Sequence, residues 1–395
     1  MSRAGSQKRT LVELLTALRP HWRRDAGLPA RIDALLGSDR RLGSRDRRLY
    51  KELIYSAVRY LPWIEPLLES DPSGAVRRIA WLAADIPSVR PFRMEISGDL
   101  PPCPEGVDGK ALVLGADPGA LTPAWFSEEC PGASAAPLRD ALLSRAPLWL
   151  RLQAADPAPA LKEFDRLGWA WRRSPLLAGA IALPPDTDVS RTDAYLAGLV
   201  EIQDIGSQLV LESARVEPAG RWLDACAGSG GKALQLACML GPSGRVCARD
   251  LRSEPLEALR VRARRAGLAG RISIGSRADP PGGYDGVLVD APCSGSGTWR
   301  RSPHLRWVTT PAGVRAAAAR QLELLREQAP RVRPGGLLVY ATCSLCRTEN
   351  ESVVDAFLRE APGFERAIPG GRLLPQWHDG DGFFVAAFRR IRPPA

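Results

Sequence analysis

Hydrophobic residues follow three patterns along the chain, and each pattern predicts a different kind of structure. From Thr10 to about Leu82 they recur every three or four residues, as in amphipathic helices. Between residues 147 and 183, two short apolar runs at Leu148–Leu152 and Trp169–Arg172 flank a helical stretch at Pro159–Leu167, which predicts a small α+β unit. From Arg221 onward, short apolar runs alternate with helical stretches, which indicates a parallel, doubly wound sheet.

The third pattern predicts five strands joined by helices. The expected strands are Trp222–Ala225, Arg245–Ala248, Arg271–Ile274, Gly286–Val289 and Leu337–Tyr340, with a late strand at Gly382–Phe388. The expected helices are Lys232–Leu240, Glu254–Ala266, Pro311–Ala329 and Asn350–Arg359. Because open α/β sheets bind ligands beyond the carboxyl ends of their strands, candidate chemistry is expected just after each strand.

These patterns predict an α/β protein with four parts. Residues 1–90 are expected to form an all-α domain, in which Ser44 caps a helix. Residues 91–145 are rich in proline and glycine and are interpreted as a poorly defined linker. Residues 146–205 form the small α+β unit, and residues 206–395 form a Rossmann-like domain.

Charge is concentrated at the N-terminus. The whole chain carries 54 basic and 44 acidic residues, a net charge of +10, and residues 1–60 hold fourteen basic and six acidic residues, hence +8 of it. Nearly all the basic residues are arginine, which binds phosphate bidentately and suits nucleic acid. A solvated helical surface is the alternative interpretation.

Composition narrows the class of protein further. The chain is 45% hydrophobic and 25% charged, which is typical of a folded globular protein. It contains no apolar run of the roughly 20 residues that span a bilayer, so no membrane association is expected. Eight cysteines are too few for a disulfide scaffold, and no signal peptide is recognised, so a cytoplasmic protein with free thiols is expected.

Glycine-rich and acidic residues follow the first two predicted strands. The turn from Asp224 to Lys232 allows close approach of a ligand to the backbone, but Cys226 and Ala233 exclude a P-loop. A tight turn between a strand and a helix is the alternative. Asp250 follows the second strand, where it is placed to bind a ribose diol; a helix cap is the alternative.

Cysteines follow the fourth and fifth predicted strands. Cys293 lies in a Pro-Cys-Ser-Gly sequence, and Cys343 lies in a Thr-Cys-Ser sequence. Both are expected to face one crevice, although burial as small hydrophobic residues is the alternative. Cys343 and Cys346 have the spacing of metal ligands, but no second pair or histidine cluster completes a zinc site, so no metal is expected.

Together, these blocks resemble the Sun-type RNA (cytosine-5) methyltransferases, which use S-adenosylmethionine. The resemblance runs from about Trp149 to Arg390, and its main blocks are Asp224–Lys232, Asp290–Gly297, Arg300–Trp307, Thr342–Ser344 and Glu349–Glu351. Residues 42–53 are similar to the NusB-like RNA-binding domain of the bacterial members, which act on small-subunit ribosomal RNA.

The resemblance implies a role for each site residue. Cys343 is the nucleophile that attacks carbon 6 of cytosine, and Cys293 assists elimination. Asp290 contacts the base, and Lys232 organises the site electrostatically. The implied cofactor-binding residues are Cys226, Ala227, Gly228, Ser229, Gly230, Gly231, Lys232, Asp250 and Asp290.

The sequence also departs from the family pattern. Gly228-Ser229 replaces the usual Ala-Pro, and Ser276 stands where an aspartate often holds the adenine, with Asp279 as a substitute. His304 replaces a common aspartate. The expected substrate is RNA, most simply small-subunit ribosomal RNA. A tRNA-modifying member of the same family and a catalytically weak RNA-binding or ribosome-assembly factor are the alternatives.

Overall fold

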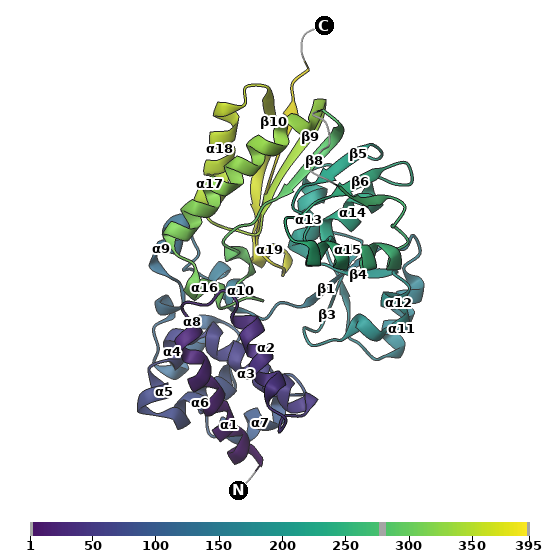
Figure 1. Cartoon of the computed structure of the whole chain (residues 1–395). Helices are drawn as coiled ribbons and strands as arrows, with labels where there is room; N and C mark the ends of the chain where they lie inside the picture. Colours follow the sequence, from purple (N-terminus) through teal and green to yellow (C-terminus); the bar gives the residue numbers. More distant parts are fainter. Residues whose placement is uncertain (1–2, 276–281, 393–395) are drawn as a thin grey trace. The chain divides into compact units, whose positions relative to one another are not determined.

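The computed structural model describes residues 3–275 and 282–392 (Figure 1). These residues form two compact units. The first contains the chain up to Arg145 together with Trp299–Thr310, and the second contains Ala146–Thr298 and the chain from Pro311 onward. Ser276 and Asp279, the candidates for adenine binding, lie outside the described residues.

The first unit is built from helices, as the spacing of its apolar residues predicts. Its first six are α1 Arg3–Leu18, α2 Leu28–Ser38, α3 Ser44–Arg59, α4 Leu61–Ile64, α5 Leu67–Ser70 and α6 Pro72–Leu82. Leu11, Leu53 and Trp81 are buried in a common core. The prediction of a Ser44 cap was wrong: Gly43 occupies the cap position, no side chain caps the helix, and Ser44 is its first residue.

Residues 91–145, which the sequence left undefined, also contribute helices to this unit. They are α7 Arg90–Ile96, α8 Val107–Leu114, α9 Ala124–Glu129 and α10 Leu138–Leu143. Phe92, Val107 and Leu121 pack into the same core as α1–α6. The glycines and prolines lie largely at helix ends; Gly115, for example, ends α8 with φ of +58°.

The segment Trp299–Thr310, which contains α16 Leu305–Val308, also belongs to the helical unit. The sequence had placed it within residues 206–395. Its Trp299 ring lies 4.3 Å from that of Phe126, and Trp307 donates a hydrogen bond to the backbone oxygen of Val58 at 2.7 Å.

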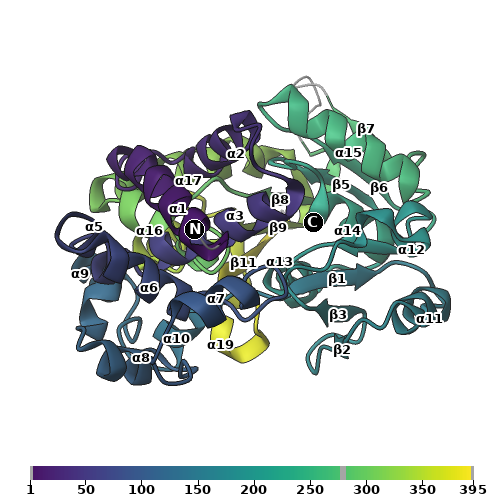
Figure 2. The ribbon, with the colours of Figure 1, turned by 90° about the horizontal axis from the view of Figure 1, so that it is seen from below.

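A small antiparallel sheet opens the second unit (Figure 2). It has the order β2-β3-β1-β4, with β1 Leu148–Leu152, β2 Arg172–Arg173, β3 Ala180–Leu183 and β4 Val200–Ile202. Helices α11 Ala158–Arg166 and α12 Asp193–Leu196 share its core. The first strand and the helix are confirmed. The strand expected at Trp169–Arg172 is shorter and later, and β3 and β4 were not predicted.

The predicted doubly wound sheet is confirmed. Its order is β10-β11-β9-β8-β5-β6-β7, and its strands are β5 Arg221–Asp224, β6 Arg245–Ala248, β7 Ile272–Ile274, β8 Tyr284–Asp290, β9 Val332–Thr342, β10 Phe364–Leu373 and β11 Phe383–Arg390. Strands β5 to β9 are parallel, whereas β11 runs antiparallel to both of its neighbours.

Helices cover both faces of this sheet (Figure 1). On one face lie α13 Ile205–Ser213, α14 Gly231–Met239 and α15 Ser253–Arg265; on the other lie α17 Pro311–Gln328 and α18 Glu351–Glu360. Within the described part of the chain, every helix is too short or too polar to cross a membrane.

Candidate active site

The predicted site residues follow three neighbouring parallel strands. Strand β8 pairs with β5 on one side and with β9 on the other, both in parallel register. The carboxyl ends of the three strands therefore lie at one edge of the sheet. The glycine-rich turn follows β5, Asp290 ends β8, and Cys343 comes directly after β9.

Backbone hydrogen bonds fix the glycine-rich turn. The Ala227 amide donates to the Arg249 oxygen at 2.7 Å, and the Gly230 amide donates to the Ala227 oxygen at 2.8 Å. Gly228 and Gly230 have φ of +50° and +87°, a region that favours glycine. A Cβ on Gly230 would lie 2.1 Å from Leu259 Cδ1, so the turn packs directly against α15.

Asp250 joins the turn through its side chain. Its Oδ2 accepts from the Gly228 amide at 2.9 Å, and its Oδ1 accepts from the Arg252 amide at 2.9 Å. Partial burial raises the pKa of Asp250, but hydrogen bonds from Arg252 and Gly228 outweigh it, and the pKa is lowered. Oδ1 also accepts from Arg252 Nε at 3.2 Å, whereas Oδ2 keeps a second lone pair for a ligand hydroxyl, so the arrangement fits the predicted ribose contact.

Cys226 contributes differently from its neighbours in the turn. Its side chain packs against the core under α17, whereas that of Ala227 packs against the opposite core. Burial and the nearby carboxylates of Asp224 and Asp290 raise the pKa of the Cys226 thiol. Cys226 is therefore held as a neutral thiol, and its backbone remains the group suited to ligand contact.

Asp224, at the end of β5, was not among the predicted site residues. It is 1% exposed, and neither carboxylate oxygen makes a hydrogen bond of ordinary geometry, although the Cys226 amide lies close enough to lower the pKa slightly. Burial, followed by repulsion from Asp290, raises the pKa of Asp224 to about 7. The feature of the sequence that could have identified Asp224 is its position at the start of the glycine-rich turn.

Lys232 and Asp290 come together as an ion pair. Lys232 Nζ lies 2.9 Å from Asp290 Oδ2, and it also lies 4.6 Å from the centroid of the Phe383 ring. The lysine side chain is 7% exposed, so the pair is shielded from water on the lysine side. Two predicted catalytic groups thus share one charge-assisted hydrogen bond.

The two predicted catalytic cysteines are in contact. Cys293 Sγ lies 3.3 Å from Cys343 Sγ, and both thiols are free. The hydrogen bond with Cys343 raises the pKa of Cys293 well above its usual value, and burial and Glu349 act in the same direction. These effects keep Cys293 protonated, and either sulfur can act as the donor in the contact.

A buried glutamate ties the two cysteine loops together. Glu349 accepts from the Ser294 amide at 2.8 Å, from Ser344 Oγ at 2.5 Å and from Gln321 Nε2 at 3.1 Å; Ser294 Oγ donates to it as well. Ser294 follows Cys293 and Ser344 follows Cys343, so one carboxylate positions both thiols. The sequence singled out Glu349 as part of a motif but gave it no role.

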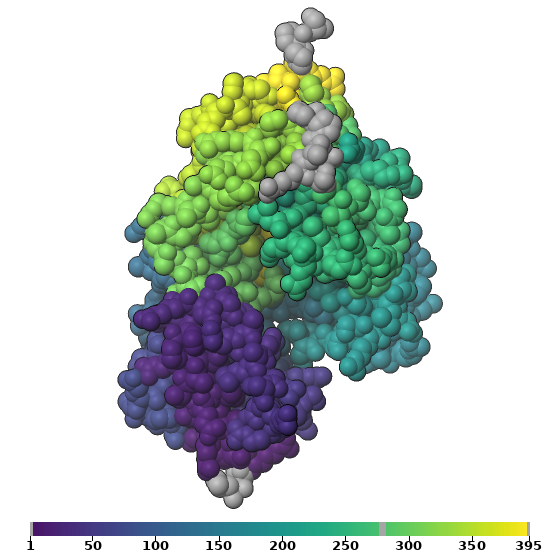
Figure 3. Space-filling model, viewed as in Figure 1, coloured from purple at the N-terminus to yellow at the C-terminus, as the bar shows by residue number. Residues whose placement is uncertain are grey.

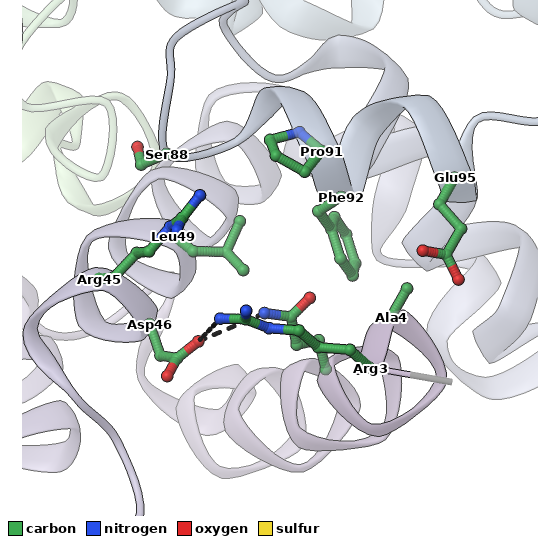
Figure 4. Close-up of a pocket in the computed structure, with 10 residues that line it drawn as sticks. Arg3, Ala4, Arg45, Asp46, Leu49, Ser88, Pro91, Phe92 and Glu95 are labelled. Atoms are coloured by element: carbon green, nitrogen blue, oxygen red, sulfur yellow. Dashed lines mark hydrogen bonds and ion pairs between the residues drawn. The ribbon is translucent and has the colours of Figure 1, made fainter. Parts of the chain in front are cut away.

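A concavity lies in the helical unit, away from the predicted site residues in the sequence (Figure 4). Residues of α1, α3 and α7 line it, among them Arg3, Arg45 and Phe92, and Arg3 pairs with Asp46 at 3.6 Å. Its lining includes none of the predicted catalytic or cofactor-binding residues. Over residues 3–275 and 282–392, His, Cys, Asp and Glu side chains form no cluster of three or more suited to a metal ion.

Comparison with known proteins identifies a family whose model matches the segment that carries these residues. The family model described as "16S rRNA methyltransferase RsmB/F" matches residues 211–389, which include the turn, the ion pair and both cysteines. Residues 211–389, which make up less than half of the chain, are thus similar to this family and form its RsmB/F domain. The predicted family resemblance is thereby confirmed for the methyltransferase domain.

Curated relatives of the RsmB/F domain extend beyond it. The probable ribosomal RNA small subunit methyltransferase B of Bacillus subtilis is 34% identical over 258 residues, which is 60% of this chain and 58% of the relative. The ribosomal RNA small subunit methyltransferase B of Vibrio cholerae is 31% identical over 259 residues, covering 62% and 59%. The chain thus spans about three fifths of the length of these relatives.

Solved structures share the fold of the RsmB/F domain at low sequence identity. The crystal structure of PH0851 matches with a TM-score of 0.73 and 20% identity, covering 99% of this chain and 100% of that one. The crystal structure of NSun6 from Pyrococcus horikoshii with SFG matches with a TM-score of 0.61 and 17% identity, covering 68% and 97%. Both confirm the predicted Rossmann-like fold.

The raised pKa of Asp224 predicts a pH-dependent stability. Its pKa is about 7 in the folded protein against an ordinary 3.8, so the folded state binds the proton more tightly. The free energy of unfolding should therefore fall as pH rises from 4 to 7, by at most about 1.4 kcal/mol per pH unit. Asp224→Asn should be more stable than the parent at pH 8, with a difference that shrinks toward pH 4 in denaturant melts. Parallel pH profiles would contradict the assignment.

Proposed function

We propose that this protein transfers a methyl group from S-adenosylmethionine to carbon 5 of a cytosine in RNA, with small-subunit ribosomal RNA as substrate. The observation that carries the proposal is the contact between Cys293 and Cys343, 3.3 Å apart at the ends of two neighbouring parallel strands. One thiol suffices to form an adduct with the base. A second thiol beside it suits a reaction that must also break that adduct.

In this proposal, the Cys343 thiolate adds to carbon 6 of cytosine, which makes carbon 5 nucleophilic. The Cys293 thiol donates a hydrogen bond to Cys343 and so stabilises the thiolate before attack. Asp290 contacts the ring nitrogen, and Lys232 holds Asp290 in place at 2.9 Å. After methyl transfer the proton on carbon 5 leaves to a base, the bond between carbon 6 and sulfur breaks with the help of Cys293, and the thiolate is regenerated.

The turn from Cys226 to Lys232, together with Asp250, is proposed to hold the cofactor. S-adenosylmethionine, when bound, supplies the electrophilic methyl group. Gly228 and Gly230 allow close approach to the backbone, and the amino end of α14, which begins at Gly231, follows at once. The carboxylate of Asp250, with its lowered pKa, accepts hydrogen bonds from ribose hydroxyls.

The assignment of ribosomal RNA rests on the relatives and on charge. The relatives from Bacillus subtilis and Vibrio cholerae are named for methylation of small-subunit ribosomal RNA. In this chain the first 60 residues carry +8 of the net charge of +10. Three of the arginines in this segment, Arg45, Arg47 and Arg48, are exposed and lie in the first half of α3. Such a surface suits a polyanion, and the reaction is proposed to take place in the cytoplasm.

The two cysteines are expected to give opposite results when they are replaced. Cys343→Ala removes the nucleophile and should form no covalent complex with RNA. In Cys293→Ala, Cys343 should still attack the base and the methyl group should still be transferred, but the covalent adduct should not be resolved. A slow-migrating protein–RNA band should therefore accumulate on a denaturing gel when S-adenosylmethionine is present. The double variant is the matched control and should give no band.

Two other outcomes would contradict these roles. A band from Cys343→Ala would make Cys293 the nucleophile. Loss of stability in both single variants, without a band from either, would make the cysteines core residues only.

The proposed substrate predicts one missing modification. Bisulfite sequencing of total RNA should detect a 5-methylcytosine in the small-subunit ribosomal RNA of the parent strain that is absent from a strain in which the gene is deleted. Expression of the Cys343→Ala variant in the deletion strain should not restore this modification. Loss from a tRNA would replace ribosomal RNA as the substrate. An unchanged set of methylcytosines would favour an RNA-binding or assembly factor.

The exposed arginines of α3 predict a salt dependence. If Arg45, Arg47 and Arg48 contact phosphates, replacing all three with glutamine should reduce the slope of log affinity for RNA against log salt by about 2, at roughly 0.7 per contact with single strands. Replacing Arg315, Arg359 and Arg389, three exposed arginines of the second unit, is the matched control and should leave the slope nearly unchanged. Equal slopes for both triple variants would make this face of α3 merely solvated.

A further inference from the structure

The cofactor turn lacks the residue that would stiffen it. The resemblance described in the sequence analysis implies Ala-Pro at this corner, where this chain has Gly228-Ser229. A glycine in place of alanine and a serine in place of proline both give the unbound backbone more freedom. A Cβ at Gly228 would meet nothing within 4 Å, and Ser229 is exposed, so packing does little to restrain this corner.

Arg262 of α15 supplies a restraint from outside the turn. Its Nη1 donates to the Ser229 backbone oxygen at 2.6 Å and to Ser229 Oγ at 3.1 Å. Leu259, one helical turn earlier on the same face, packs against Gly230. Two side chains of α15 therefore hold two successive residues of the turn, one by hydrogen bonds and one by packing.

A buried carboxylate fixes Arg262 itself. Glu201 of β4 is 1% exposed, and its Oε1 accepts from Arg262 Nε at 3.2 Å. Arg265 Nη2 donates to both oxygens of the same carboxylate, at 2.8 and 2.7 Å, and its guanidinium lies 3.7 Å from the centroid of the Tyr195 ring. Glu201 thus directs the guanidinium of Arg262, and it would keep a charged partner if Arg262 were replaced.

We propose that Arg262, oriented by Glu201, is a positioning residue that holds the Ser229 corner of the cofactor turn in its binding conformation, and so takes the place of the proline. The inference rests on the proposed cofactor site and adds a residue from outside the family motif. Restraint before binding lowers the conformational entropy that the turn must lose when the cofactor enters. Part of helix α15 lies at the surface seen in Figure 3, in green, and Arg262 is half-buried, outside the core to which Leu259 belongs.

The test compares two arginines of one helix. Arg262→Ala should raise the dissociation constant for S-adenosylmethionine, measured by calorimetry, roughly three- to tenfold. The matched control is Arg260→Ala, because Arg260 is exposed and pairs only locally with Glu257 at 3.1 Å; its affinity should equal that of the parent. Ser229→Ala keeps the backbone acceptor and should change affinity less than twofold, whereas Arg262→Lys should fall between the parent and Arg262→Ala.

A second readout needs no cofactor. In the cofactor-free protein, Arg262→Ala should speed hydrogen exchange at the amides of residues 228–231, while exchange in β5 and β6 stays unchanged. Equal affinities and equal exchange in Arg262→Ala and Arg260→Ala would overturn the positioning role.

Asp250→Ala separates this failure from a failure of the cofactor site itself. Weaker binding by Asp250→Ala, together with normal binding and exchange in Arg262→Ala, would reject the positioning role of Arg262 and leave the proposed cofactor site standing. Unchanged binding in a folded Asp250→Ala would reject the proposed cofactor site, and the exchange measurement would still decide whether Arg262 restrains the turn.

Discussion

The parallel pairing of β8 with β9 is the constraint on which the rest of the site depends. Each strand ends in a short polar loop, and the pairing register aligns Asp290 with Ala341. Cys293 is three residues past the first of these positions and Cys343 is two past the second, so the thiols meet at 3.3 Å. A change in register would separate them, because successive residues of a strand point to opposite faces of the sheet.

The strand register alone does not fix the two cysteine loops relative to each other, and Glu349 supplies the hydrogen bonds that do. Its carboxylate is fully buried and accepts hydrogen bonds from both cysteine loops and from Gln321 of α17. The opposite end of the site relies on a different carboxylate, since Asp290 pairs with Lys232. The two carboxylates therefore have different partners: Glu349 joins the two cysteine loops, and Asp290 is paired with a lysine.

The sequence predicted what depends on local pattern. Apolar runs and crossover helices located the central strands, and the rule that parallel strands end at one edge placed Cys293 beside Cys343. Strand β10 was missed because Phe364–Leu373 contains a proline and two glycines and is largely exposed, so it reads as a loop. The contact between Arg262 and Ser229 was missed because 33 residues separate them, and pairing between distant polar residues leaves no periodic signal.

The same reasoning explains why segment 299–310 was assigned to the wrong neighbours. It lies inside the RsmB/F match, directly after the Cys293 loop, so chain order placed it in the Rossmann-like domain. In the structure Arg306 is fully buried within the helical unit, where it donates to backbone oxygens of Arg59 and Leu142 at 3.3 and 3.0 Å. Burial, reinforced by Arg59, lowers the pKa of Arg306 to about 9.

A fragment that begins at residue 146 would lose these acceptors and would expose the rings of Trp299 and Trp307, which Arg306 bridges. Water would hydrate the freed guanidinium, but the exposure of apolar ring surface costs roughly 25 cal/mol per Å². The helical unit therefore supplies the packing and the acceptors that segment 299–310 needs. The boundary of a family match and the boundary of a folding unit differ here because one continuous sequence motif serves two hydrophobic cores.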